Sequence, residues 1–117
     1  MALDWHLLGA LGGAEVEIIP VEVTATGGNG STAVIQSVTV PDGETWLVVL
    51  TGHLDAYYSS ASGPELYIGP DSVGPGLAIG NASIAAEVTG TVEIGIKRNN
   101  SDSADGFYGQ VYLVPLS

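Results

Sequence analysis

The stretch VTVPDGETWLVVL, residues 38–50, decides the fold that this sequence predicts. It starts with apolar and polar residues in alternation, passes through a Pro-Asp-Gly turn at residues 41–43, and ends in a run that is apolar on both faces. Proline presets the φ angle of such a turn, and glycine supplies the position with positive φ. A strand that is apolar on both faces is either central in its sheet or covered by a partner. The stretch therefore indicates a strand, a tight turn and a second strand of one of these two kinds.

Similar strand and turn signals recur along the rest of the chain. The segments that read as strands are Glu15–Val23, Ala33–Val40, Thr45–Leu50, His53–Tyr58, Glu65–Ile68, Leu77–Ile79, Ser83–Val88, Thr91–Lys97 and Phe107–Leu116. Joining the third and fourth gives about eight strands, separated by glycine and proline at regular intervals, as in a sandwich or jelly roll. We expect an all-β, single-domain antiparallel β-sandwich of jelly-roll type over residues 14–117. The apolar phase slips at Ile19 and Pro20, which predicts a bulge or an edge position there.

The charge balance is the most unusual feature of the composition. Thirteen acidic residues stand against only Lys97 and Arg98, so the formal net charge is -11. Such a surface repels phosphate groups, which excludes direct binding of nucleic acid. Like charges also destabilise a compact fold unless salt screens them, and the Debye length falls to about 3 Å at roughly 1 M salt. We expect a protein of a salt-loving organism or of its virus, with an ordinary acidic extracellular module as the alternative.

The residue patterns of common catalytic and metal sites are missing from the chain. There is no cysteine, which excludes disulfides, thiolate metal sites and a cysteine nucleophile. His6 and His53 are the only histidines, and neither has a second histidine or a glutamate at the spacing of a zinc site. No Gly-x-Ser-x-Gly motif occurs. We therefore expect a protein that is not an enzyme and binds no cofactor.

Two weaker patterns concern ions and glycans. The loop 99–106 is rich in oxygen ligands, and Asp102 and Asp105 are weak candidates for binding Ca²⁺, although the loop lacks the spacing of an EF-hand. Long hairpin loops have the same composition, so we expect no metal there. Asn29, Asn81 and Asn99 each begin an Asn-x-Ser sequon at an expected turn, which leaves glycosylation open.

The first residues, MALDWHLLGALGG, form an apolar N-terminal arm over residues 1–13. They lack the basic residues of a secretion signal and are shorter than the ~20 residues that span a bilayer, so we expect neither a signal peptide nor a membrane anchor. Leucines four residues apart would gather on one side of a short helix. The arm covers either its own sheet or another subunit. The residues expected to bind a partner are Leu3, Trp5, Leu7, Leu8 and Leu11.

Residues 38–50 and the closing stretch GQVYLVPL, residues 109–116, resemble small jelly-roll virion proteins of tailed viruses. In those proteins a turn of Pro-x-Gly type enters an aromatic and aliphatic strand, and the last strand ends the chain. The acidic, lysine-poor composition is similar to that of tailed viruses of halophilic archaea. The resemblance covers about residues 38–117, and its motifs are signals of strands and turns rather than of catalysis.

The resemblance implies a structural role on the outside of a virus particle. The protein would be a capsid decoration or turret protein, or a collar or tail-fibre component. It would form a symmetric homo-oligomer, most simply a trimer, and would dock through residues 1–13 on other virion proteins such as the major capsid protein. One hydrophobic sheet face, either that of Trp46, Val48 and Leu50 or that of Leu47 and Val49, would meet the neighbours.

Two other functions stay open at this point. An extracellular or tail-fibre module that binds glycans would use Tyr57 and Tyr58 as stacking platforms, with Tyr67, Tyr108 and Trp46 as further candidates. Residues 40–53 also resemble the first metal-binding motif of cupins, which hold a metal inside a small jelly roll. Of the ligands of that motif only His53 is present, so this resemblance implies a cupin-like protein without a metal.

Overall fold

The alternating apolar residues form eight β-strands in the computed structural model of the chain. The structure describes residues 16–28, 30–55, 64–73, 79–99 and 105–116. The strands are β1 (Glu17–Ala25), β2 (Thr32–Thr39), β3 (Trp46–Asp55), β4 (Glu65–Ile68), β5 (Asp71–Val73), β6 (Ile79–Val88), β7 (Thr91–Lys97) and β8 (Asp105–Pro115). Over these ranges the structure contains no helix with the length and apolar character needed to cross a bilayer.

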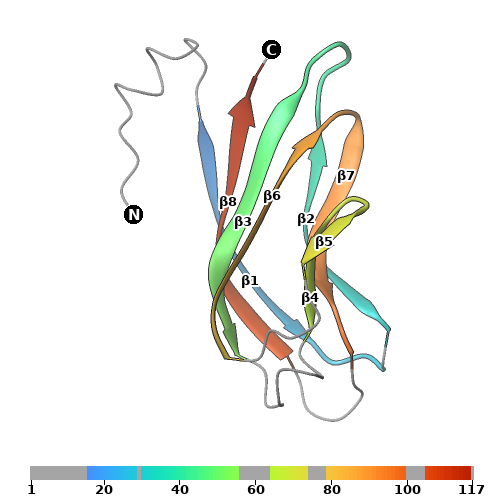
Figure 1. Cartoon of the computed structure of the whole chain (residues 1–117), viewed down its shortest axis with the longest axis vertical. Helices are drawn as coiled ribbons and strands as arrows, with labels where there is room; N and C mark the ends of the chain where they lie inside the picture. The colour runs from blue at the N-terminus through green and yellow to red at the C-terminus, as the bar shows by residue number, and fades with distance from the viewer. Residues whose placement is uncertain (1–15, 29, 56–63, 74–78, 100–104, 117) are drawn as a thin grey trace.

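The strands form two four-stranded antiparallel sheets that pack face to face (Figure 1). Sheet A has the order β1-β8-β3-β6, and sheet B has the order β2-β7-β4-β5. The pairs β1/β8, β2/β7, β3/β6 and β4/β5 nest inside one another, like one long hairpin that has been rolled up. The predicted antiparallel β-sandwich is confirmed, and the nested pairing agrees with the expected jelly-roll connectivity.

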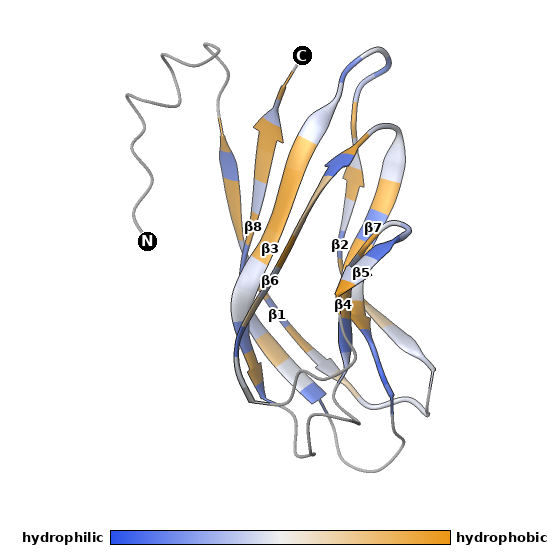
Figure 2. Cartoon of the chain, in the orientation of Figure 1, coloured by the Kyte–Doolittle hydropathy of each residue, from blue (hydrophilic) through white to orange (hydrophobic). Residues whose placement is uncertain are grey.

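The core lies between the sheets and is built by the inward side chains of both. On β3, Val48, Leu50 and Leu54 are buried while the residues between them are half-buried. Figure 2 shows the same alternation of hydrophobic and hydrophilic residues along several strands. Complete burial of such a side chain stabilises the fold by about 1.5–3 kcal/mol. Since β3 lies between β8 and β6, the prediction of a central strand is confirmed for the run that ends at Leu50.

The phase slip in β1 reflects an edge position and two apolar faces, not a bulge. β1 is the edge strand of sheet A, and its register with β8 runs without a shift from Glu17 opposite Leu113 to Ala25 opposite Asp105. Ile18 lies on the outer face of the sheet, whereas Ile19 packs against the core. Adjacent apolar residues therefore mark two faces here. The register shift lies instead in β2, between Val34 and Gln36.

Two other details differ from the sequence-based expectation. β5 was not expected, because its three residues are all exposed and carry no apolar alternation. Ile79 and Ser83, expected on separate strands, both belong to β6. The strand expected over His53–Tyr58 continues β3 and is described as far as Asp55.

Two glycines allow β3 and β8 to approach closely at the middle of sheet A. Gly52 lies opposite Gly109, and a Cβ atom on Gly52 would lie 2.8 Å from the Gly109 Cα. The same atom would lie 2.9 Å from Cζ of Phe107, whose ring is buried in the core. The ring thus occupies the space that a side chain at residue 52 would need.

Replacing Gly52 by alanine should therefore destabilise the protein. The added methyl group meets backbone atoms of β8, and overpacking of this kind costs about 1–3 kcal/mol. Urea unfolding followed by circular dichroism measures the change. Gly28→Ala is the matched control, because a Cβ there has no atom within 4 Å. Equal effects of the two substitutions would contradict this account of the β3–β8 contact.

Candidate functional site

The only arginine of the chain is buried at the end of the sandwich where β7 stops and β8 starts. Arg98 is 1% exposed, and its Nε donates to Oδ2 of Asp105, 3.0 Å away, whose side chain is completely buried. Nη1 of Arg98 also donates to the carbonyl of Gly27 in the β1–β2 connection. A buried charge is tolerated only when partners of this kind satisfy it.

Backbone hydrogen bonds fix Arg98 at the same point. Its amide donates to the Ser31 carbonyl at 2.9 Å, and its carbonyl accepts from the Gly30 amide at 2.8 Å. Alternate residues of β7 point into the core, and Ile94 and Ile96 are buried in this way. Arg98 is the next residue in this alternation, so its side chain also points inward. Arg98 therefore joins the β1–β2 connection, the end of β7 and the start of β8.

This arrangement gives Asp105 a role other than the metal ligation considered from the sequence. One of its oxygens accepts from Arg98, and the other, Oδ1, is buried without a hydrogen-bond partner in the described part of the chain. Asp102 lies outside the described residues. Within the described ranges, no group of three or more potential metal-ligating side chains occurs. The structure thus makes Asp105 the counter-ion of Arg98.

The outer face of sheet A carries an apolar patch. Cross-strand pairing places Ile18, Tyr112 and Val49 in one row across β1, β8 and β3. Val114 and Leu47 form the next row. Ile18 is 37% exposed and the other four are half-buried, so the patch is partly open to solvent in the isolated chain. We call these five residues the sheet A patch.

The pairing of β3 with β8 decides between the two faces of β3 that the sequence offered for contact with neighbours. Val48 and Leu50 are fully buried in the core, so they are not available to a partner. Leu47 and Val49 belong to the sheet A patch, which leaves this face as the candidate. Trp46 is half-buried, and its Nε1 donates to Oε1 of Glu44 at 2.9 Å.

Further along the same outer face lies an aromatic pair. The rings of His53 and Tyr108 are 5.3 Å apart between centroids and inclined at 35°, and Tyr108 is 55% exposed. His53 therefore lies outside the sandwich, whereas the metal of a cupin lies inside. This placement does not suit the cupin-like alternative.

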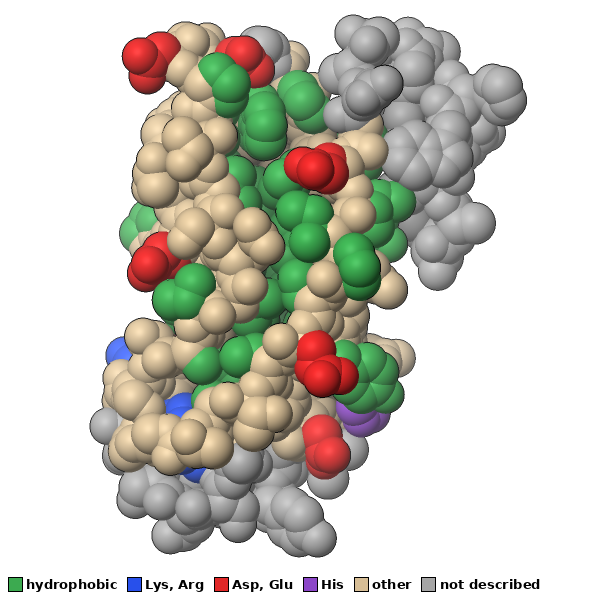
Figure 3. Space-filling view, turned by 180° about the vertical axis from the view of Figure 1, so that it is seen from behind, with side chains coloured by type: hydrophobic (Ala, Val, Ile, Leu, Met, Phe, Trp, Pro, Cys, Tyr) green, Lys and Arg blue, Asp and Glu red, His purple; other side chains and the backbone are tan. Residues whose placement is uncertain are grey.

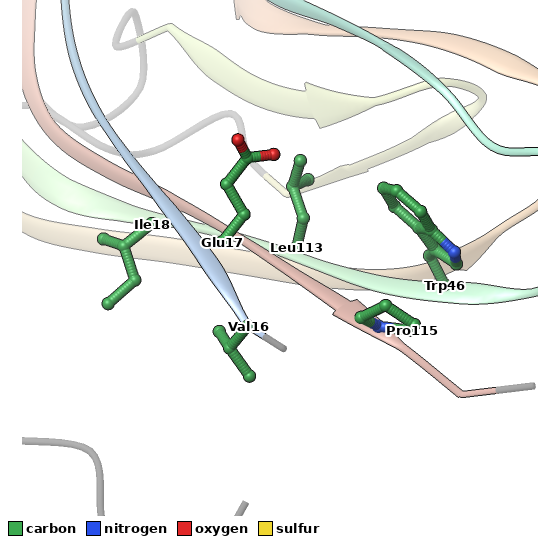
Figure 4. Close-up of a pocket in the computed structure, with 6 residues that line it drawn as sticks. All are labelled: Val16, Glu17, Ile18, Trp46, Leu113 and Pro115. Carbon is green, nitrogen blue, oxygen red and sulfur yellow. The ribbon is translucent and has the colours of Figure 1, made fainter. Parts of the chain in front are cut away.

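A hollow of about 520 Å³ opens at the end of the sandwich where β1 begins (Figure 4). Its lining includes Trp46, Leu113 and Pro115, together with residues 16–18 at the start of β1. Figure 4 shows that Glu17 and Leu113 point to one side of the sheet, while Val16 and Ile18 point to the other. The hollow thus adjoins the sheet A patch and the start of β1.

Seen from behind, hydrophobic side chains gather along the middle of the molecule, with acidic side chains beside and around them (Figure 3). This side contains the edge strands β1 and β2, which pack beside each other without pairing in a sheet. Half-buried residues of both strands pack against the core here, among them Val21, Val23 and Ile35. The seam is apolar, and its half-buried side chains pack against the core.

The outer face of sheet B is different in character. Tyr67 on β4 lies opposite Gly95 on β7, and a Cβ on that glycine would lie 2.7 Å from the tyrosine Oη and 3.0 Å from its Cζ. The ring therefore lies across the neighbouring strand over the glycine. Burial is the main cause that raises the pKa of Tyr67 above 10.0; the Glu93 carboxylate adds to this, and a hydrogen bond with the Thr32 side chain opposes it.

Several residues named from the sequence lie outside the described residues. They are the arm residues Leu3, Trp5, Leu7, Leu8 and Leu11, the tyrosines Tyr57 and Tyr58, and Asn29. Asn81 was expected at a turn, but it lies within β6 and is exposed on the outer face of sheet A, opposite His53. Asn99 is the second residue after β7 and is half-buried. The burial of Arg98 was missed in the sequence analysis, although the inward-facing pattern of β7 pointed to it, and so was the position of Tyr67 over Gly95.

A comparison of the chain with protein-family models, with curated proteins and with solved structures finds no match. The surfaces described above therefore carry the functional argument.

Removing the buried cation should cost much of the stability of the fold. Arg98→Met leaves the Asp105 carboxylate buried and unpaired, for which we expect a loss of about 3–5 kcal/mol in the free energy of unfolding. Lys97→Met is the matched control, because Lys97 is the exposed neighbour and such changes stay within about 0.5 kcal/mol. Chemical denaturation measures both.

If Arg98→Met does not fold, the double variant Arg98→Met/Asp105→Leu should recover part of the stability, since it removes both charges. A single variant as stable as Lys97→Met would show that the ion pair does not hold this end of the sandwich.

The tyrosine on sheet B should make stability depend on alkaline pH. Because its pKa is raised in the folded state, the unfolded chain loses the Tyr67 proton first as the pH rises above about 10. The free energy of unfolding should then fall between the unfolded and folded pKa values. Urea unfolding at about pH 9 and about pH 11 should show a smaller fall in Tyr67→Phe than in the unmodified protein. An equal fall in both would contradict the assignment.

Proposed function

We propose that the protein is a non-enzymatic structural protein that forms a homo-oligomer on the surface of a virus particle, as a capsid decoration or turret component. The observation that carries this proposal is the sheet A patch, an apolar surface on a chain with a net charge of -11. Apolar surface that stays exposed on a small, highly charged domain is typical of an interaction site.

The geometry of the patch suits contact with a second flat surface. Its residues come from three neighbouring strands of one sheet, so they form a continuous area rather than scattered side chains. The patch contains no charged side chain that a partner would have to neutralise. Glu87 on β6 lies at the margin of the patch, opposite Leu47. An apolar centre with charged residues at the rim is the usual anatomy of a protein interface.

The charge of the chain makes such assembly dependent on salt. The Arg98–Asp105 pair neutralises itself, so twelve of the thirteen acidic residues and only Lys97 of the two basic residues remain outside it. Copies of the protein therefore repel one another at low ionic strength. Molar salt screens this repulsion, and salting-out salts also strengthen apolar burial. A saline source and an assembling protein are thus consistent with each other.

The N-terminal arm supplies a second contact in this proposal. The apolar residues of the arm precede Val16, which lines the hollow beside Trp46 and Leu113. Docking of the arm on a neighbouring copy or on the major capsid protein would bury Trp5 and the leucines. The likeness of residues 38–50 and 109–116 to virion proteins of tailed viruses supports the particle surface as the site of assembly.

A charge placed in the sheet A patch should prevent assembly. We expect Ile18→Glu to shift the protein toward the monomer in molar salt, because the new carboxylate would have to be buried at the interface. Val34→Glu is the matched control, since Val34 is 45% exposed on the outer face of sheet B, against 37% for Ile18 on sheet A. Sedimentation analysis at low and molar salt measures the oligomeric state.

The proposed assembly is wrong if the unmodified protein stays monomeric in molar salt, or if the two variants assemble equally well. Deletion of residues 1–13 separates the two contacts. A truncated protein that still forms the oligomer but no longer binds particles would assign the arm to docking and the patch to self-assembly.

A further inference from the structure

The outer face of sheet B contains a polar hollow that the proposed assembly does not use. It measures about 340 Å³ and is formed by β2, β4, β7 and the turn that leads into β5. The residues that the argument needs are Tyr67, Thr32, Ser72, Glu65, Glu93 and Lys97. These side chains belong to the opposite sheet from the sheet A patch, so both surfaces are available at once.

The hollow is lined by an aromatic ring whose hydroxyl end lies over a glycine of the neighbouring strand. Tyr67 lies over Gly95, which has no side chain to lift the ring from the sheet. Thr32 on β2, two strands away, lines the same hollow, and its side chain acts on the pKa of the Tyr67 phenol. The ring is half-buried and lines the hollow, so part of it is open to a ligand. A ring fixed in this way offers an apolar face with little loss of conformational entropy on binding.

Groups that hydrogen-bond to hydroxyls surround the ring. Along β7, Glu93 and Lys97 lie two residues to either side of Gly95 on the same face, about 13 Å apart at about 3.3 Å per residue. Glu65 on β4 lies opposite Lys97, and Ser72 on β5 lies opposite Tyr67. Carboxylates accept hydrogen bonds, an ammonium group donates them and a hydroxyl does both.

The combination selects one class of ligand. An apolar ring face suits the C–H face of a sugar ring, and carboxylates form strong, charge-assisted hydrogen bonds with sugar hydroxyls. Two carboxylates on a chain of net charge -11 repel anions, which disfavours phosphorylated, sulfated and sialylated molecules. We infer that the outer face of sheet B binds a neutral saccharide, with Tyr67 as the stacking platform and Glu65 and Glu93 as hydroxyl acceptors.

This site differs from the one expected from the sequence. The tyrosines named there were Tyr57 and Tyr58, which lie outside the described residues, with Tyr67 only among the further candidates. A ring over a glycine also stabilises a β-strand by itself. The experiment must therefore separate ligand binding from the stability of the sheet.

The test uses the full-length protein in molar salt and a panel of neutral hexasaccharides built from glucose, mannose or galactose, with sialylated and sulfated glycans as the anionic arm. Affinity is measured by titration calorimetry or by saturation-transfer NMR. We expect at least one neutral saccharide to bind, Tyr67→Ala to weaken that binding at least about tenfold, and Tyr67→Phe to retain it within about threefold, because the ring remains.

Tyr108→Ala is the matched control, since it removes an exposed tyrosine from the outer face of sheet A and should leave the affinity unchanged. Glu65→Gln is the second variant, in case Tyr67→Ala fails to fold. It keeps the shape of the side chain but removes the charge of the hydroxyl acceptor, so it should weaken binding. The inference is overturned if no neutral saccharide binds at millimolar concentration, if anionic glycans bind better, or if Tyr108→Ala and Tyr67→Ala have equal effects. The oligomeric state is recorded for each variant, so a failure of the proposed assembly is seen separately.

Discussion

The ion pair between Arg98 and Asp105 sets the geometry of the end of the sandwich where β1, β7 and β8 meet. A guanidinium group is costly to bury, so the carboxylate of Asp105 and the carbonyl of Gly27 must both be in place when this end closes. β1 and β8 are the first and last strands of the chain and lie side by side in sheet A. One cluster of polar contacts thus depends on segments from both ends of the sequence, which favours a single cooperative fold.

The alternation of apolar residues predicted the sandwich because burial of one strand face leaves a period of two in the sequence. It was ambiguous where both faces are apolar: the phase slip at Ile19 and Pro20 predicted a bulge or an edge position, and the structure shows the edge position without a bulge. The burial of Arg98 could have been predicted from the sequence, because Arg98 continues the inward-facing alternation of Ile94 and Ile96. The position of Tyr67 over Gly95 could not have been predicted, because the pairing of β4 with β7 joins residues that no local sequence pattern connects.

The two outer faces of the sandwich divide the chemistry of the surface between them. The sheet A patch is apolar and continuous across three strands, which suits a protein partner. The hollow on sheet B is lined by carboxylates, hydroxyls and one ammonium group around a tyrosine ring, which suits a small polar ligand. A two-sheet sandwich permits this division because each sheet has one face in the core and one face in solvent. Assembly through one face would also repeat the other face in a symmetric array, where weak sites gain from multivalency.

The burial of Arg98 has a consequence for proteolysis. Proteases that cut after basic residues have only two target positions in the whole chain, and these are adjacent. Lys97 ends β7, the Arg98 side chain is buried, and the amide that follows Lys97 is hydrogen-bonded to Ser31. Cleavage at this point requires the corner formed by β1, β7 and β8 to open first. The rate at which such a protease cuts the native protein thus reports how often that corner opens.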